Sequence, residues 1–309
     1  MGVRVVVLAG GTGDLGGRIA KAFGDRNVPF RALVRPGAAA AARAGSIATG
    51  ATIVEVDYDD AAGLRDACAR ASCVVSALNG LEPVIIGMQG RLLDAAVAAG
   101  VPRFIPSDYS LDYTKTRPGD NRNMELRRAF MARIDGTPIR TTSVLNGAFA
   151  ELLTGEAPIV LRKQHRILTW GDVDQPLDFT AKDDVASYVA DVALDDASPR
   201  FLRIAGTTVT PRDLAGIMTD VTKERFRPLR PGGIGLLSAL IRIARTLTPP
   251  SDDVFPPWQG MQYLRDMASG RGKLDPLDND RYGARTWTTA RDVLARRVSP
   301  ASASAQQRS

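Results

Sequence analysis

The chain has 309 residues, of which 44% are hydrophobic and 24% are charged, and such values are typical of a globular protein. No apolar run approaches the roughly 18 residues that a membrane span requires. Two cysteines, Cys68 and Cys73, and a single histidine, His165, exclude a disulfide framework and an ordinary zinc site. The net charge of +6 suits anionic small molecules and does not by itself indicate nucleic-acid binding.

These features lead us to expect no metal, no nucleic acid and no membrane among the partners. The basic stretch Lys223–Arg245 is interpreted as a solvated face. His165 is interpreted as a solvated turn residue, and Cys68 and Cys73 as inert packing residues. The first ten residues are too short and too glycine-rich for a signal peptide, so we expect a cytoplasmic location.

Strand and helix patterns alternate along the first half of the chain, which predicts a parallel sheet with right-handed crossovers. The predicted strands are Val3–Leu8, Phe30–Val34, Thr52–Val56, Cys73–Ala77, Arg103–Pro106 and Ile139–Val144. The predicted helices are Leu15–Phe23, Ala38–Ala48, Ala61–Arg70, Gly87–Ala99 and Glu125–Arg133.

The pattern loosens after Gly147. Short strands are predicted at Ile159–Leu161, Arg166–Leu168 and Phe201–Ile204, and helices at Lys182–Leu194, Thr210–Val221 and Ile234–Leu247. The last helix is apolar apart from two arginines, and we favour a packing helix over one that lies on a membrane surface. We therefore expect a dinucleotide-binding domain over residues 1–150, a substrate-binding portion over 151–298 that is interleaved with it, and a disordered tail over 299–309.

A glycine-rich loop follows the first strand directly and opens a helix. Glycines in this context let the chain turn off the strand, let a pyrophosphate approach the backbone, and let helix and sheet pack closely. The helix start offers unpaired N–H groups to the phosphates. The alternative is a purely structural turn, and the loop fits both G-x-x-G-x-x-G and G-x-G-x-x-G. We predict that a dinucleotide binds at Gly10, Gly11, Thr12, Gly13, Asp14, Leu15 and Gly16.

Arg35 stands at the end of the second strand, where an NAD site would carry Asp or Glu. A guanidinium pairs with a 2′-phosphate, so NADP(H) is favoured over NAD, although a solvated surface arginine would give the same pattern. Other contacts to the cofactor are expected from the carboxyl ends of the third and fourth strands. These residues are Asp57, Tyr58, Ser76, Ala77 and Leu78, and Asp57 alternatively forms a turn.

Taken together, these motifs resemble the NmrA-like proteins, which include the isoflavone reductase and phenylcoumaran benzylic ether reductase group of atypical short-chain dehydrogenases. The resemblance covers residues 3–150 well and continues more loosely to about 296. It is carried by the loop from Gly10 to Gly16, Ala32-Leu33-Val34-Arg35, Val56-Asp57, Val74-Val75-Ser76-Ala77 and Arg103-Phe104-Ile105-Pro106-Ser107-Asp108.

This resemblance implies a Rossmann-type doubly wound parallel sheet that binds NADPH, with a smaller α+β C-terminal substrate portion. Catalytic members reduce aromatic small molecules, and non-catalytic members act as redox-sensing regulators. It further implies cofactor contacts from Pro106, Ser107, Asn146 and Gly147. One departure is that Asn123 occupies the position where the reductases carry a lysine.

Hydride transfer leaves a negative charge that a general acid must protonate. Candidates lie in the loop after the fifth strand, and Tyr109 would be a good donor if a nearby Lys115 lowered its pKa. Alternatively, the tyrosines of this loop pack and Lys115 is solvated. The predicted catalytic residues are Tyr109, Lys115, Ser107 and Asn123, and the predicted substrate contacts are Asp108, Tyr113, Phe149 and Trp170.

The function that these observations favour is an NADPH-dependent oxidoreductase that reduces a small aromatic or conjugated substrate, as a homodimer or a monomer. The alternative is a non-catalytic NADP(H)-binding redox sensor of the NmrA type, which the missing lysine favours. A sugar-nucleotide epimerase-like enzyme is a weaker alternative, because the chain has no Tyr-x-x-x-Lys pair.

Overall fold

The computed structural model describes residues 4–39, 50–155, 157–249 and 251–298. These residues form two compact units, and each unit is discontinuous in the sequence. The first unit comprises Met1–Tyr109, Asn123–Val144 and Val185–Leu202, and the second comprises Ser110–Arg122, Leu145–Asp184 and Arg203–Ser309. No helix within the described ranges is both long enough and apolar enough to span a membrane.

The first unit is built on a six-stranded parallel sheet in the order β3-β2-β1-β4-β5-β6, which is the strand order of dinucleotide-binding folds. The Rossmann-type sheet expected from the sequence is therefore confirmed. Strand β1 lies at its centre, and its residues Val6 to Ala9 are fully buried. The strands are β1 (Val5–Ala9), β2 (Phe30–Val34), β3 (Ala51–Glu55), β4 (Ala71–Ser76), β5 (Arg103–Ile105) and β6 (Arg140–Thr141).

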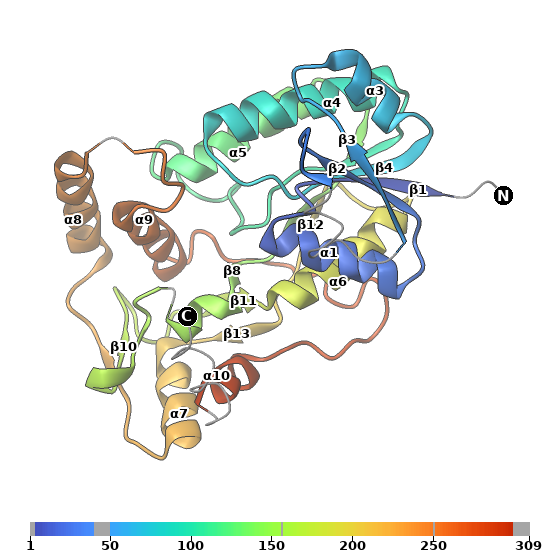
Figure 1. Cartoon of the computed structure of the whole chain (residues 1–309). Coiled ribbons are helices and arrows are strands. Elements are labelled where there is room, and N and C mark those ends of the chain that lie inside the picture. Colours follow the sequence, from blue (N-terminus) through green and yellow to red (C-terminus); the bar gives the residue numbers. More distant parts are fainter. Residues whose placement is uncertain (1–3, 40–49, 156, 250, 299–309) are drawn as a thin grey trace. The chain divides into compact units, whose positions relative to one another are not determined.

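Helices cover both faces of this sheet. Figure 1 shows α3, α4 and α5 on one face, and α1 and α6 on the other. Leu64, Leu92 and Phe130 come from the first group and join the buried cluster that contains Val7. The helices are α1 (Asp14–Asp25), α3 (Ala61–Cys68), a π-helical turn (Pro83–Met88) that continues into α4 (Gln89–Ala98), α5 (Arg122–Asp135) and α6 (Lys182–Leu194).

Two arginines, one buried and one half-buried, attach segment 185–202 to the rest of the first unit. Arg103 on β5 is 2% exposed and donates to the carbonyl oxygens of Val192 (2.8 Å) and Ala193 (3.2 Å). Arg26, after α1, donates to Asp191 at 3.0 Å. Both guanidiniums thus find acceptors in the late segment, and such acceptors matter because buried donors are costly when unpaired.

Short strands and helices make up the second unit. Its three-stranded sheets have the orders β14-β10-β9 and β13-β11-β8. A separate two-stranded sheet pairs β12 with β7, and most of its residues belong to the first unit. The strands are β7 (Ser143–Leu145), β8 (Ala148–Phe149), β9 (Val160–Leu161), β10 (Arg166–Leu168), β11 (Leu177–Thr180), β12 (Phe201–Arg203), β13 (Thr207–Val209) and β14 (Arg227–Leu229). The helices are α7 (Pro211–Thr222), α8 (Ile234–Leu247), α9 (Pro257–Ala268) and α10 (Ala290–Val298), with 3-10 turns at Ala150–Thr154 and Arg162–Gln164.

Most sequence-predicted elements occur within a few residues of their expected bounds. Thr210 caps α7, and its side chain accepts the N–H of Asp213 at 3.0 Å in a capping box. One prediction is wrong: Ile139–Val144 is two strands, because β6 pairs with β5 whereas β7 pairs with β12. The predicted helix Ala38–Ala48 falls almost entirely outside the described residues, as does the predicted tail 299–309.

A buried ion pair holds the loop after β5 inside the second unit. Asp112 is fully buried, and its carboxylate accepts from Arg203 at 2.7 Å and from the Thr114 backbone at 3.2 Å. Its other neighbour is Lys115, whose ammonium lies 3.6 Å away. Removing one member of such a pair leaves the other charged and unpaired, which commonly costs 3–5 kcal/mol.

Replacing Asp112 with alanine is therefore expected to lower the free energy of unfolding by about 3 kcal/mol or more, measured by urea denaturation. The matched control is Asp174→Ala, which breaks an exposed pair with Arg212 of the same 2.7 Å length. Solvent screens an exposed pair, so this control should lose much less stability. Equal losses for the two variants would contradict the importance of burial at Asp112.

Candidate functional site

Gly10 ends β1 in a conformation that only glycine adopts easily. Its φ is +79°, and a Cβ there would lie 2.6 Å from the carbonyl oxygen of Ala77 and 3.0 Å from the nitrogen of Leu78. The backbone after β1 therefore passes against the backbone after β4. This close approach places the start of α1 at the carboxyl edge of the sheet.

Gly16 is the other restricted position of the loop. The N–H of Gly13 donates to the Gly10 carbonyl at 3.0 Å, and a Cβ on Gly16 would overlap that same oxygen. A Cβ at Gly11 would lie 3.3 Å from a Leu8 methyl group, and one at Gly13 would lie 3.4 Å from the Gly10 carbonyl oxygen. The geometry thus requires glycine at Gly10 and Gly16, and because of Gly10 it favours the G-x-x-G-x-x-G register of the two that the sequence allowed.

Helix α1 begins without a capping side chain among the described residues, because its N-cap is Gly13. The first N–H groups of a helix have no partner within the helix and carry a partial positive charge, so they bind anions. Asp14 lies in this first turn, and its carboxylate pairs with Arg18 at 2.8 Å. The arrangement suits the backbone recognition of a phosphate.

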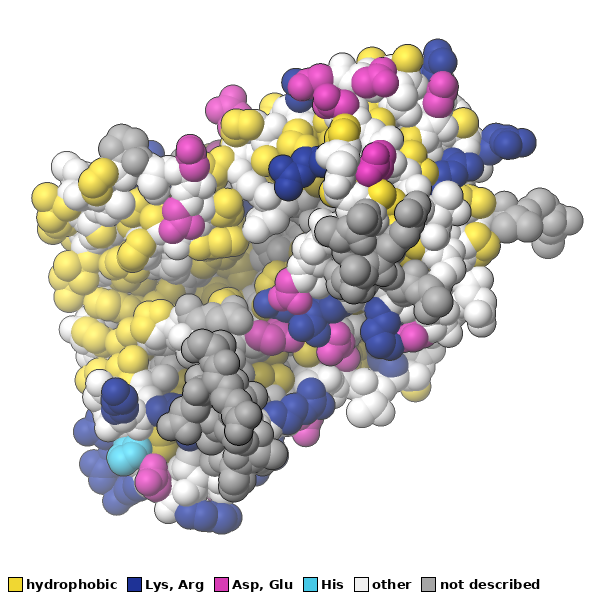
Figure 2. Space-filling model, in the orientation of Figure 1, with side chains coloured by type: hydrophobic (Ala, Val, Ile, Leu, Met, Phe, Trp, Pro, Cys, Tyr) yellow, Lys and Arg dark blue, Asp and Glu magenta, His cyan; other side chains and the backbone are white. Residues whose placement is uncertain are grey.

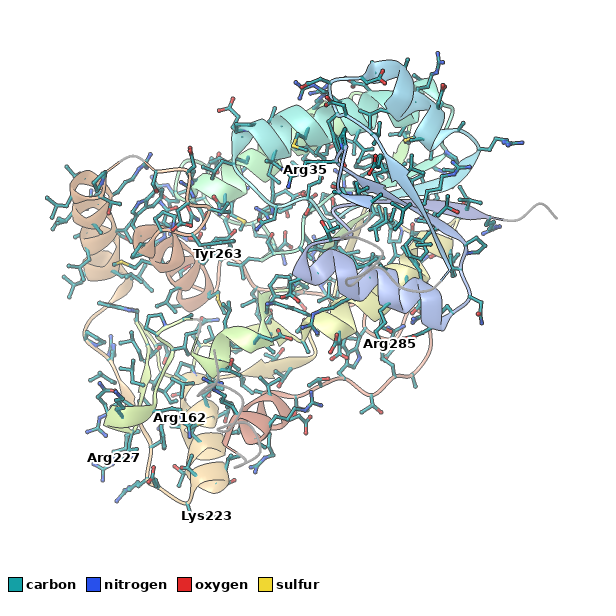
Figure 3. All side chains as sticks on the ribbon, viewed as in Figure 1. Arg35, Arg162, Lys223, Arg227, Tyr263 and Arg285 are labelled. Carbon is teal, nitrogen blue, oxygen red and sulfur yellow. The ribbon has the colours of Figure 1, made fainter. Side chains whose placement is uncertain are left out.

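Arg35 follows β2 at the same edge as the glycine loop (Figure 3). In the parallel register Leu8 pairs with Ala32 and Ala9 with Leu33. The chain that follows β2 at Arg35 therefore runs beside the glycine loop that follows β1. Arg35 is exposed, and no ion pair holds its guanidinium within the described ranges. Arg31, in contrast, donates to the carbonyls of Ala67 (3.0 Å) and Ala69 (2.8 Å). Of the two arginines, only Arg35 is available to a ligand anion.

The neighbouring strand ends carry the other predicted cofactor contacts. Ser76 is fully buried, and its hydroxyl has no hydrogen-bond partner among the described residues. Asp57 accepts the N–H of Asp59 at 3.0 Å, so it forms the turn that was its alternative interpretation. Tyr58 is buried, which raises the pKa of its phenol. Ala77 and Leu78 are half-buried beside Gly10, and Thr12 and Leu15 lie in the loop itself.

The segment after β5 is held by two polar contacts within the first unit. The N–H of Ser107 donates to the Gln89 side chain at 2.9 Å, and Asp108 accepts from the Ser143 hydroxyl at 2.7 Å. Gln89 is fully buried and directly follows the π-helical turn, a feature frequent at functional sites. Sequence reasoning missed this residue, although a glutamine between apolar helix residues was an available signal. Pro106 is buried in the same segment.

Tyr109 is buried at the end of this segment, and its hydroxyl has no partner among the described residues. Burial raises the pKa of the phenol, and the nearby Asp108 and Cys73 raise it further. The expected lowering by Lys115 is therefore wrong. Lys115 instead donates to the backbone carbonyls of Lys273 (3.3 Å) and Asp275 (2.8 Å). Tyr109 keeps its proton across the physiological pH range.

Asn123 is 2% exposed near the start of α5, and its backbone carbonyl accepts a hydrogen bond from the Arg127 side chain at 3.1 Å. Its side chain thus lies in a buried position, although an amide cannot act as lysine would. Tyr113 is fully buried in the second unit, as is Asn121, which donates to Asp266 at 2.9 Å and accepts from Gln259 at 2.8 Å.

Asn146 is the most conspicuous polar residue of the second unit. It is fully buried, and neither its amide oxygen nor its amide nitrogen has a partner among the described residues. Gly147 follows with a φ of +69°, and a Cβ there would overlap the Asp178 carbonyl. Buried amides without partners are rare and call for a ligand or a water molecule. Asn146 is therefore a candidate ligand contact.

The aromatic candidates differ in their surroundings. Trp170 packs with Leu237 and Ile241 in a small apolar cluster, which favours its packing role over substrate contact. Phe149 is half-buried on β8, with the Lys182 ammonium 5.7 Å from its ring centre.

His165 and the two cysteines stay outside the candidate site. His165 sits in a turn, paired with Glu224 at 2.9 Å. Burial raises the pKa of the Cys68 thiol to about 11 and that of Cys73 to about 12. Both thiols therefore stay protonated and unreactive, in agreement with a packing role.

A parallel sheet of this strand order with a glycine loop at the carboxyl end of β1 defines a Rossmann-type dinucleotide-binding protein. The NmrA-like family profile matches residues 3–230. The chain belongs to the NmrA-like family, which confirms the resemblance found in the sequence.

Known proteins support this assignment. The chain is 29% identical to bifunctional pinoresinol-lariciresinol reductase 3 of Thuja plicata over 64% of its own length and 67% of the relative's. It is also 29% identical to the isoflavone reductase homolog IRL of Zea mays, over 72% and 75% of the two chains. Among solved structures, AtPrR2 with NADP+ and (+)pinoresinol matches with a TM-score of 0.77 at 21% identity, over 96% of this chain and 98% of that one.

Substitution of Gly16 by alanine is expected to weaken NADPH binding at least tenfold, since a methyl group there must displace the Gly10 carbonyl from the phosphate-binding turn. NADPH fluorescence titration measures the effect. The control is Gly216→Ala in α7, where a Cβ meets no atom within 4 Å. An unchanged affinity in the Gly16 variant would contradict the role of the loop.

Proposed function

We propose that the protein is an oxidoreductase that binds NADP(H) on its first unit. The observation that carries this proposal is the loop Gly10–Gly16, whose backbone contacts exclude a Cβ at Gly10 and at Gly16, next to the unpaired guanidinium of Arg35. Uncapped N–H groups of α1 would hold the pyrophosphate, and Arg35 would hold the 2′-phosphate. The relatives support the proposal, since they are reductases by name and the AtPrR2 structure contains NADP+.

The substrate that this proposal favours is a small aromatic or conjugated molecule. When bound, NADPH supplies the hydride, so the chain has to orient the substrate and provide a proton. Two buried polar groups without partners suit these tasks. The Asn146 amide can orient a polar group of substrate or cofactor, and the Tyr109 hydroxyl, kept protonated by burial, can donate a proton. Ser107, Asp108 and Tyr113 remain candidates in the same loop.

One observation favours a second function. Asn123, which stands where the related reductases carry a lysine, cannot donate a proton as lysine does. A protein of this family without that donor can bind NADP(H) as a redox-sensing regulator and leave the cofactor unreacted. The two functions share the cofactor site and differ only in turnover.

Replacing Arg35 with glutamine is expected to reduce the affinity for NADPH by about tenfold to a hundredfold, because a charge-assisted hydrogen bond contributes about 1.5–3 kcal/mol. The affinity for NADH should change less than about twofold, since NADH lacks the 2′-phosphate. Calorimetric titration of both coenzymes measures the difference. The control, Arg65→Gln, removes an exposed arginine that pairs with Asp66. Equal losses for NADPH and NADH would rule out the assigned role.

Turnover separates the two functions. Purified protein with NADPH and a panel of aromatic ketones, quinones and enones should show substrate-dependent loss of absorbance at the nicotinamide band. Tyr109→Phe should then lower kcat at least tenfold with unchanged NADPH affinity, if Tyr109 is the donor. Tight NADPH binding without turnover on any member of the panel would favour the sensor instead.

A further inference from the structure

Helix α8 is apolar on two faces, and only one of them is covered. Leu237 and Ile241 are buried against Trp170 and Ala268. The second face is an exposed row at spacings of four, three and four residues, which places its members along one side of the helix. This apolar row consists of Leu236 (49% exposed), Leu240 (37%), Ile243 (56%) and Leu247 (76%).

Large apolar side chains are rarely exposed as a continuous row on a monomer, and such rows mark binding surfaces. In Figure 2 hydrophobic side chains gather at the left of the view, where α8 lies in Figure 1. Packing explains Leu237 and Ile241 but leaves the apolar row without a role. The helix was expected from its sequence to be a packing helix, and this second face is the part that packing does not use.

The second unit also contains many basic residues that lack acidic partners among the described residues, most of them on β10, on β14 and in the turns beside these strands. Arg166 on β10 lies directly beside Arg227 on β14 in the parallel register, and like charges so placed repel each other. Elsewhere in the unit arginines are paired, as Arg291 is with Asp220 at 2.6 Å. Within the described ranges no ion pair involves Arg162, Lys163, Arg166, Lys223, Arg225, Arg227, Arg230, Arg242 or Arg245, which we call the basic cluster.

The charge of segment 223–247 is strongly one-sided. Residues 223–247 contain six basic side chains against Glu224 alone, and α8 itself contains no acid. Glu224 is already engaged by His165. Two further acids, Asp252 and Asp253, follow the helix, and the Asp253 carboxylate accepts the N–H of Phe255 at 2.9 Å. Figure 3 places the cluster members Arg162, Lys223 and Arg227 around β10, β14 and the end of α7.

We propose that the apolar row of α8 and the basic cluster together dock the protein on an anionic lipid surface. At 14 residues, α8 is about 21 Å long, so it lies in the plane of the headgroups and does not cross them. The row enters the boundary between headgroups and acyl chains, and the arginines pair with lipid phosphates.

Charge complementarity selects this occupant over a second copy of the chain. A second copy joined through α8 would bring no acid from its own helix to pair with the basic cluster, because α8 contains none. An anionic membrane meets the same cations with opposite charge, and each of them adds about fivefold to binding. The proposal does not depend on the cofactor.

The test is sedimentation of the full chain with vesicles of phosphatidylcholine alone and with 30% phosphatidylglycerol. We expect binding at least tenfold stronger to the anionic vesicles and strongly reduced by salt. Leu240→Gln/Ile243→Gln should lower it at least tenfold. Arg225→Gln/Arg227→Gln/Arg230→Gln should lower it about a hundredfold, at about fivefold for each charge.

Matched controls change the same residue types elsewhere. Leu277→Gln removes an exposed leucine outside the row (41% exposed), and Arg65→Gln/Arg91→Gln/Arg212→Gln removes three exposed, paired arginines. These variants should bind as the wild type does, and circular dichroism should show all variants folded.

Two results would overturn the proposal. The first is equal or absent binding to the two kinds of vesicle. The second is a dimer in light scattering that Leu240→Gln/Ile243→Gln dissociates, because the row would then be an interface between copies. Variants that bind lipid less but keep the wild-type molecular mass support docking on lipid.

Discussion

The first unit depends on the approach of three backbone segments at the end of β1. Gly10 passes the backbone after β4 at a distance that excludes any side chain, and the Gly10 carbonyl fills the space where Gly16 would carry a Cβ. Because these contacts join a central strand to the first turn of α1, they fix the direction of the helix relative to the sheet. The uncapped N–H groups of α1 then lie at the edge of the sheet that carries Arg35 and Ser76. The steric contacts of the two glycines thus determine where the sheet edge can bind an anion.

Burial has opposite consequences for two sets of polar groups. Arg103 and Asp112 are buried and fully engaged, and they hold distant segments together. Ser76, Tyr109 and Asn146 are buried as well, yet their side chains lack partners among the described residues. An unmet buried hydrogen bond costs about 1–3 kcal/mol, so a structure retains such groups mainly where a ligand or water completes them. The difference between the two sets separates residues that stabilise the chain from those that we assign to binding.

Local sequence patterns predicted much of the first unit. Apolar strands such as Phe30–Val34 and the glycine loop carry their signal within a few residues, so their positions could be derived. Arg35 could be proposed from the sequence because its position follows directly from the end of a strand. The split of Ile139–Val144 was not predictable, since alternation of side chains does not identify the partner strand.

The second unit was harder to predict. Strands β11, β13 and β14 have three or four residues each, too few for a periodic pattern. The contacts of Gln89 with Ser107 and of Asp112 with Arg203 join residues far apart in the chain, and no local pattern indicates them. The role of Lys115 was mispredicted for the same reason, because its acceptors come from residues 273 and 275.

The interleaving of the two units has a consequence for how such a chain can evolve. A gene fragment that ends at residue 150 would lack segment 185–202, which supplies the acceptors for Arg103 and Arg26 and most of the helix that covers one face of the sheet. Because each unit is discontinuous, recombination at a single crossover cannot exchange one unit for that of another family member. A chain cut in this way would leave the buried guanidinium of Arg103 without its acceptors.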